Sequence, residues 1–111
     1  MYYVYILYSK KDKNFYTGYT HDLRRRYLEH QNGLVESTCS RRPILLIYYE
    51  AYISKNNAEQ REIFYKSGRG RETLLKILKE TLEGVVGEIK KLKEEDVKIK
   101  KRLEVIEKKI R

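Results

Sequence analysis

The sequence has few of the features expected of a secreted or membrane protein. Cys39 is its only cysteine, which excludes an internal disulfide and a cysteine-based zinc cluster. Cys39 lies in a polar stretch with no histidine nearby in sequence, so we interpret it as an incidental thiol. The sequence also lacks an apolar run of about 18 residues and a signal-peptide pattern. We therefore expect a cytoplasmic protein with no membrane association.

Aromatic residues are missing from the second part of the chain. All eleven tyrosines and both phenylalanines lie at or before Tyr65. The later residues are rich in Lys, Glu, Leu and Ile, which is typical of continuous helix. A chain of 111 residues has room for one compact domain and little more. We therefore predict a domain at residues 1–81 and a helical oligomerisation segment at residues 82–111.

Acidic residues are outnumbered: 25 Lys and Arg face 16 Asp and Glu, giving a formal charge of +9. Such a field attracts polyanions, so nucleic acid is the leading partner, with DNA expected and RNA left open. No segment is typical of a module that reads base edges. We therefore expect weak sequence preference and strong salt dependence.

Hydrophobic patterning predicts an α/β fold, a three-stranded antiparallel sheet flanked by helices. The expected strands are 2–8, 15–19 and 44–52, and the expected helices are 21–31, 55–66 and one from about residue 71. Residues 33–43 are predicted to be a polar, basic loop and residues 44–52 a buried strand. The helix from residue 71 is expected to cover the open face of the sheet through Leu74, Leu75, Ile77, Leu78 and Leu82.

Five residues in the first domain could support hydrolysis of a phosphodiester: Tyr5, Tyr16, Arg26, His30 and Glu62. They supply weak bases, a fixed positive charge, an imidazole and a metal-binding carboxylate. Taken singly, each is typical of an ordinary role in strand packing, on a basic surface or at a helix end. Their joint spacing favours a site.

The same positions resemble the GIY-YIG nuclease family, and most closely its small stand-alone bacterial members. The resemblance rests on Tyr3-Val4-Tyr5, Tyr16-Thr17-Gly18, Arg26 followed by His30, and Arg61-Glu62 after Ala58. Tyr3 replaces the usual glycine and Thr17 the usual isoleucine. The sequence has no asparagine after Glu62, where many members carry one.

The resemblance implies a metal-dependent endonuclease. Tyr5 or Tyr16 would act as general base toward a water, Arg26 would stabilise the charge on the scissile phosphate, and His30 would take or relay the proton. Glu62 would hold a single Mg²⁺, with Mn²⁺ as the alternative. Because a free phenol titrates near pH 10, positive charge nearby must favour the phenolate.

Polar and basic residues outside this set are expected to contact backbone phosphates. They are Arg24, Arg25, Ser37, Thr38, Arg41, Arg42, Arg69 and Arg71. The alternative is that these arginines only keep the protein soluble.

Residues 82–110 carry a heptad pattern interrupted by Asp96. Its positions are Leu82, Val85, Ile89, Leu92, Asp96, Ile99, Leu103, Ile106 and Ile110. This pattern predicts a parallel, coiled-coil-like homo-oligomer, with folding back onto the domain as the main alternative. Gly84 and Gly87 could form a hinge.

Two other functions remain open from the sequence. The chain could be a non-catalytic nucleic-acid-binding module that positions a partner, or an assembly protein whose tail sets valency. Binding without cleavage, or a monomeric mass, would distinguish them. The primary expectation is hydrolysis of DNA phosphodiesters at nicked, branched or otherwise distorted sites.

Overall fold

A computed structural model describes residues 1–85 and 101–102 of the chain. Residues 1–77 form one compact unit, and the chain from Leu78 onward belongs to a second unit. Within the second unit, residues 79–85 are helical. The remainder of the predicted heptad pattern lies outside the described residues. None of the described helices is long and apolar enough to cross a membrane.

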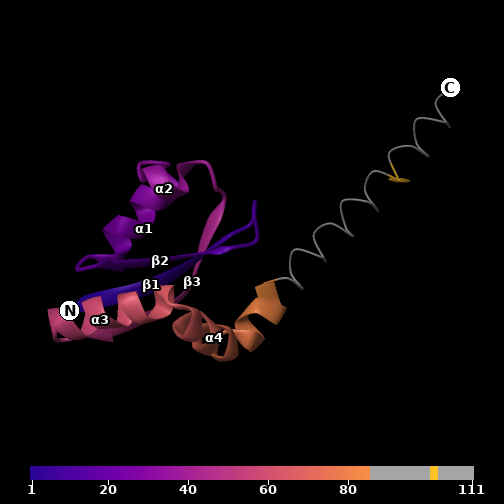
Figure 1. Cartoon of the computed structure of the whole chain (residues 1–111). Coiled ribbons are helices and arrows are strands. Elements are labelled where there is room, and N and C mark those ends of the chain that lie inside the picture. The colour runs from indigo at the N-terminus through magenta and orange to yellow at the C-terminus, as the bar shows by residue number, and fades with distance from the viewer. Residues whose placement is uncertain (86–100, 103–111) are drawn as a thin grey trace, which may run out of the picture. The chain divides into compact units, whose positions relative to one another are not determined.

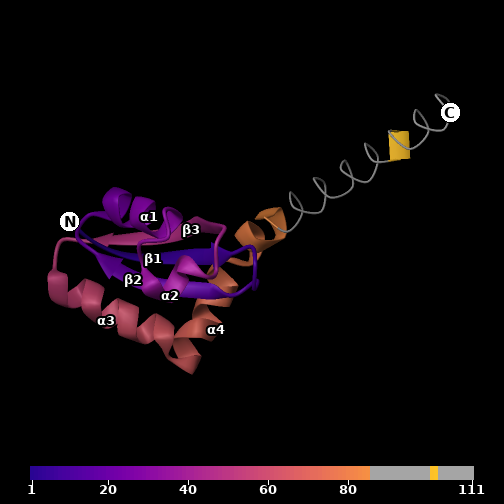
Figure 2. The same ribbon diagram turned by 90° about the horizontal axis from the view of Figure 1, so that it is seen from above.

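The first unit is built on a three-stranded antiparallel sheet, as predicted (Figure 1). Strands β1 (Tyr2–Ser9), β2 (Phe15–Thr20) and β3 (Ile44–Tyr52) are arranged in the order β2-β1-β3. Figure 2 shows β1 running between the other two. A tight turn joins β1 to β2, since Ser9 donates its backbone N–H to the carbonyl of Asn14 at 2.9 Å.

The central strand is buried on both faces. Residues Val4 to Leu7 are at most 1% exposed, and alternate side chains point to opposite faces. β3 was predicted to be a buried strand, and this is wrong for most of its length. Ile44 is buried, but Tyr49 is 54% exposed because β3 lies at the sheet edge.

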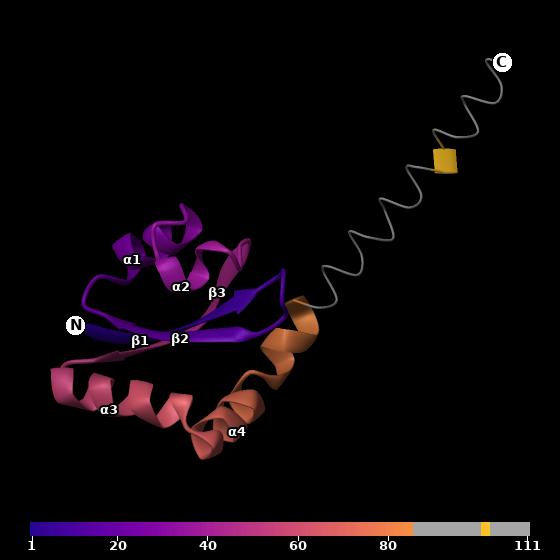
Figure 3. The ribbon, with the colours of Figure 1, turned by 45° about the horizontal axis from the view of Figure 1, so that its top comes forward.

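Helices cover the two faces of the sheet (Figure 3). α1 (Leu23–Gln31) and α2 (Glu36–Cys39) lie on one face, and α3 (Lys55–Lys66) lies on the other. Asp22 caps α1 and Ser54 caps α3, because each side chain accepts a backbone N–H of the first turn. The predicted helices agree with α1 and α3, whereas the short α2 lies inside a predicted loop.

The fourth helix, α4 (Gly68–Ile77), starts earlier than predicted and packs mainly against α3. A Cβ at Gly70 would lie 1.6 Å from the Phe64 carbonyl oxygen, so only glycine allows this close approach. Leu74 is buried, but Leu75 and Ile77 are 45% and 43% exposed. The expectation that this helix covers the sheet is therefore wrong, since α3 does so.

A hydrogen-bonded carboxylate fixes α3 to the sheet. Glu50 of β3 accepts the Nε–H of Arg61 at 2.9 Å and the hydroxyl of Tyr65, both from α3. It also accepts the hydroxyls of Tyr48 at 2.7 Å and Tyr52 at 2.5 Å. Burial would raise the pKa of Glu50, but these bonds outweigh it and lower the pKa to about 2. Glu50 is thus an anion that orients the helix that carries Glu62.

Candidate active site

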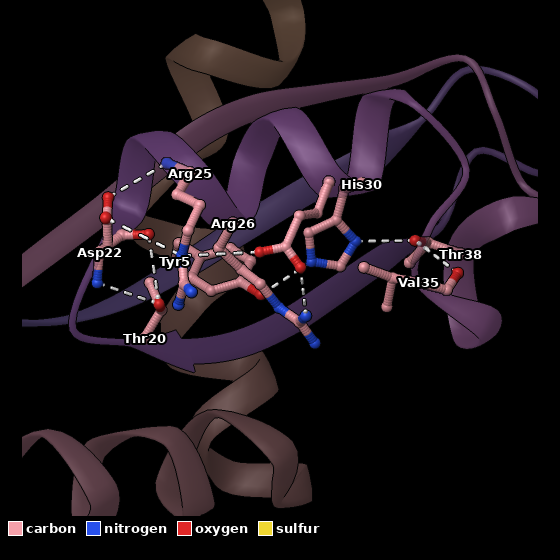
Figure 4. Close-up of polar contacts among 9 residues, drawn as sticks. Tyr5, Thr20, Asp22, Arg25, Arg26, His30, Val35 and Thr38 are labelled. Atoms are coloured by element: carbon pink, nitrogen blue, oxygen red, sulfur yellow. Dashed lines mark hydrogen bonds and ion pairs between the residues drawn. The ribbon is translucent and has the colours of Figure 1, made fainter.

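Tyr5 and His30 meet on the face of the sheet that α1 covers (Figure 4). The Tyr5 hydroxyl lies 2.8 Å from His30 Nε2, and the two residues are 1% and 0% exposed. Tyr5 comes from the middle of β1 and His30 from the last turn of α1. Two of the five predicted site residues therefore meet although they are 25 positions apart in sequence.

Both ring nitrogens of His30 are hydrogen-bonded. The Thr38 hydroxyl lies 2.7 Å from His30 Nδ1 and 3.5 Å from the Val35 carbonyl oxygen. With the Tyr5 hydroxyl at Nε2, a neutral imidazole donates to one of the two hydroxyls and accepts from the other. Burial and then the charge of Arg26 lower the pKa of His30 to about 4, so the imidazole is neutral at pH 7.

Arg26 brings a permanent positive charge to this pair. Burial raises the pKa of Tyr5 to about 12, while hydrogen bonding and attraction from Arg26 act in the opposite direction. Arg26 is half-buried and also donates to Glu29 at 3.3 Å. Tyr5 therefore remains a protonated phenol in the free protein.

Tyr16 is the more accessible of the two phenols. Its ring centroid lies 5.1 Å from that of His30 and 6.3 Å from that of Tyr5. Tyr16 is half-buried, and its hydroxyl makes no hydrogen bond to the part of the chain that the structure describes. From the sequence, Tyr5 and Tyr16 were equal candidates for the general base. In the structure, Tyr16 is the one of the two whose hydroxyl is free for a water or substrate to reach.

Gly18 allows Tyr5 to take this position. The two residues are paired across β1 and β2, and a Cβ at Gly18 would lie 2.3 Å from the Tyr5 hydroxyl oxygen. Any larger residue would displace the phenol. Antiparallel pairing of the predicted strands 2–8 and 15–19 was the signal that could have identified this requirement, because it sets Gly18 opposite Tyr5.

Glu62 lies on α3 and is close enough for its charge to contribute to the raised pKa of Tyr5. Its side chain is 22% exposed, and one oxygen accepts from Lys66 Nζ at 2.7 Å. Among the described residues, no group of three or more His, Cys, Asp or Glu side chains could hold a metal ion. A single carboxylate fits a hard cation that keeps several waters and binds substrate phosphate, as Mg²⁺ does.

The expected phosphate contacts differ in availability. Thr38 is 0% exposed and engaged with His30, so the expectation that it contacts phosphate is wrong. Arg41 is held by Asp12, with Nε 2.5 Å from the carboxylate, and by the Phe15 carbonyl at 3.3 Å. The exposed members of the set are Arg24, Arg25, Ser37, Arg42, Arg69 and Arg71.

Comparison with known proteins identifies the family of the domain that carries these residues. Residues 1–74 match the GIY-YIG catalytic domain. The UPF0213 protein CPE1444 of Clostridium perfringens is 42% identical over 67 residues, which cover 60% of this chain and 71% of that protein. The UPF0213 protein SSP2268 of Staphylococcus saprophyticus is 38% identical over 79 residues, covering 70% and 94%.

Among solved structures, the solution NMR structure of the UPF0213 protein BH0048 from Bacillus halodurans is 40% identical. The match covers 69% of this chain and 85% of that one, with a TM-score of 0.45. The segment that matches the family, residues 1–74, contains the two tyrosines, Arg26, His30 and Glu62. The chain belongs to the GIY-YIG nuclease family.

Proposed function

We propose that the chain is a metal-dependent endonuclease that hydrolyses DNA phosphodiester bonds. It would select distorted sites rather than a base sequence. The observation that carries this proposal is the free phenol of Tyr16 beside the Tyr5–His30 hydrogen bond, with His30 neutral. An accessible weak base next to a neutral imidazole and a guanidinium suits proton removal from a water.

Tyr16 is the general base in this scheme. Tyr16 gives its own proton to solvent and, as phenolate, takes a proton from the water that attacks phosphorus. The bond from phosphorus to the 3′ oxygen breaks, and that oxygen leaves as a hydroxyl after taking a proton from solvent. Arg26 stabilises both the phenolate and the charge that develops on the phosphoryl oxygens. Tyr5 and His30 are hydrogen-bonded to each other. In this scheme the pair therefore positions the neighbouring ring of Tyr16, and His30 does not relay the proton as the resemblance implied.

Glu62 would hold Mg²⁺ or Mn²⁺. When bound, such an ion supplies Lewis-acid stabilisation of the leaving 3′ oxygen. Lys66 must release Glu62 for this, and an exposed pair four residues apart on a helix is worth only about 0.3–0.5 kcal/mol. The exchange therefore costs little, and the ion binds weakly without nucleic acid.

Cleavage of labelled nicked, branched and linear DNA, with Mg²⁺ and with chelator, tests the proposal. We expect cutting of the distorted substrates that is abolished by chelator and by Glu62→Gln, with Tyr16→Phe purified in parallel to exclude contaminating nucleases. Cutting that survives chelator and Glu62→Gln would remove the metal role. Binding of DNA and RNA without cleavage of any substrate would favour the non-catalytic module.

We also propose that residues 82–111 join copies of the chain into a homo-oligomer. We propose that the protein acts in the cytoplasm. The support is the heptad pattern alone. Sedimentation of the full chain against a version ending at Thr81 tests it, and equal monomeric masses would contradict it.

A further inference from the structure

A cavity of about 240 Å³ opens beside the candidate active site. It lies between β2, the end of α3 and the start of α4, elements that can be followed in Figure 3. The lining residues are Phe15, Tyr16, Thr17, Tyr65, Lys66, Arg71 and Leu74. None of the catalytic roles above uses this space, although Tyr16 borders it.

The cavity has an apolar floor and a cationic rim. Tyr65 and Leu74 are 2% and 1% exposed, so they form the floor. Phe15 is half-buried and supplies an aromatic ring at the wall. Tyr16, its neighbour on β2, turns its ring to the opposite face of the sheet, toward His30, and borders the cavity from the edge strand. Arg71 is exposed at the rim. The aromatic rings inside the cavity suit the base of a nucleotide, and the cations at the rim suit its phosphate.

Both rim cations are available to a ligand. Arg71 has no carboxylate within ion-pair distance among residues 1–85 and 101–102. Lys66 is exposed and has one partner, Glu62. Exposed pairs of this kind are weak, so a phosphate can compete for Lys66. The rim therefore offers two cations to an anion.

The size of the cavity limits what it can hold. Pockets for drug-sized ligands measure roughly 300–1,000 Å³, and this one is smaller at about 240 Å³. Its volume therefore limits an occupant to about one base with its sugar. Aromatic side chains stack on any base, so the choice of base is weak.

We propose that this cavity binds one unpaired nucleotide next to the scissile phosphate. The base packs against Phe15, and the phosphate is bound by Arg71 and Lys66. The position next to the scissile phosphate rests on the proposed function, because Tyr16 belongs both to the cavity lining and to the candidate active site. A base in the cavity cannot remain paired in a duplex, so the cavity selects nicks, flaps and junctions.

The test measures metal-free binding, which needs no cleavage. The probes, in chelator, are a labelled single-stranded oligodeoxynucleotide, a fully paired duplex, a free deoxynucleoside 5′-monophosphate and inorganic phosphate. Arg71→Gln is compared with Arg69→Gln, which removes the same charge from the same helix but outside the cavity. Phe15→Leu tests the aromatic wall.

We expect Arg71→Gln and Phe15→Leu to weaken single-strand binding about five- to tenfold, with duplex binding changed much less. Arg69→Gln should weaken both by a similar small factor. The single strand and the monophosphate should each shift the NMR signals of the Leu74 methyl groups in the unmodified protein.

Equal losses for Arg71→Gln and Arg69→Gln, or unshifted Leu74 signals, would overturn the proposal. Shifts with inorganic phosphate as large as those with the nucleotides would reduce the cavity to an anion site and also overturn it. Because Arg71 is exposed, its variant should fold even if Phe15→Leu does not. Cleavage of DNA by a protein whose cavity binds no nucleotide contradicts only this inference. Binding of a nucleotide in the cavity without cleavage of DNA contradicts only the nuclease proposal.

Discussion

The phenol of Tyr5 lies over Gly18 on the neighbouring strand and occupies the space that a side chain at position 18 would need. A Cβ there would come within 2.2 Å of the ring carbon that bears the hydroxyl. The same hydroxyl is hydrogen-bonded to His30 at 2.8 Å. One glycine thus determines whether the β-sheet and α1 can share this contact.

Gly18→Ala should therefore damage the site more than the fold. The added methyl group must push the Tyr5 ring away, at a cost of about 1–3 kcal/mol in stability. Displacing a site residue by about 1 Å can cost about 100-fold in rate. Thermal unfolding and single-turnover cleavage would measure the two effects. Gly68→Ala is the matched control, since its Cβ would meet nothing within 4 Å, and an equal rate loss there would contradict the explanation.

The two tyrosines should respond differently to loss of their hydroxyls. Tyr16→Phe removes the accessible base, so the rate should fall by about 10²- to 10⁴-fold with little change in stability. Tyr5→Phe leaves the buried Nε2 of His30 without a hydrogen-bond partner and should cost about 1–3 kcal/mol in stability. Cleavage rates and denaturant unfolding of both variants would test this. A larger rate loss in a stably folded Tyr5→Phe would assign the base to Tyr5 instead.

The sequence was sufficient to predict the strands and two of the helices, because alternation and end signals are local. The third strand and α3 were predicted with the bounds that the structure shows, Ile44–Tyr52 and Lys55–Lys66. Their surroundings could not be predicted in the same way. Tyr49 lies in an apolar and aromatic run that is typical of a buried strand, yet its side chain is exposed because β3 is an edge strand of the sheet.

Pairwise contacts were the main thing that the sequence did not provide. Thr38 appeared to be one more polar loop residue, but it holds the imidazole of His30. Gly70 lies just before the predicted helix start at about residue 71, but in the structure it is inside α4, where the backbone of α3 passes too close for a side chain. Such roles depend on partners that are distant in sequence or on the packing of two helices, and no local pattern encodes them.

Stability should fall in mildly acidic solution because of His30. Its pKa is 6.5 in an unfolded chain and about 4 in the folded protein, chiefly because of burial. Between these values the unfolded state binds more protons, so the free energy of unfolding rises with pH and is lost as pH falls from about 6.5 to 4. At about 1.4 kcal/mol per pKa unit, the loss approaches about 3 kcal/mol.

Urea unfolding at intervals from pH 7 to pH 4 would measure this slope. His30→Gln should be less stable at pH 7 but should lose the slope in this window. His21→Gln is the control, because His21 is exposed and outside the site, and it should keep the slope. A slope unchanged in His30→Gln would show that another group causes the acid sensitivity.

Glu50→Gln should destabilise the first unit by removing the anion that holds α3. The side chains of Glu50 and Arg61 are 15% and 33% exposed, so the pair is partly shielded from water. Removing one partner of a fully buried pair costs about 3–5 kcal/mol, and a partly exposed pair should cost less, about 2 kcal/mol. Glu59→Gln is the matched control on α3, where the ion pair with Lys55 at 3.9 Å is exposed and should be worth little.

The pH dependence separates this carboxylate from His30. Hydrogen bonds hold the pKa of Glu50 at about 2, below its ordinary value of 4.5, so its contribution is present above about pH 4.5 and lost as pH falls toward 2. Glu50→Gln should therefore reduce the pH dependence of the free energy of unfolding below pH 4.5. The pH dependence between pH 6.5 and 4.5, which comes from His30, should remain. If denaturant unfolding gave equal stabilities for Glu50→Gln and Glu59→Gln, the tyrosine hydroxyls and Arg61 would be holding α3 without help from the charge.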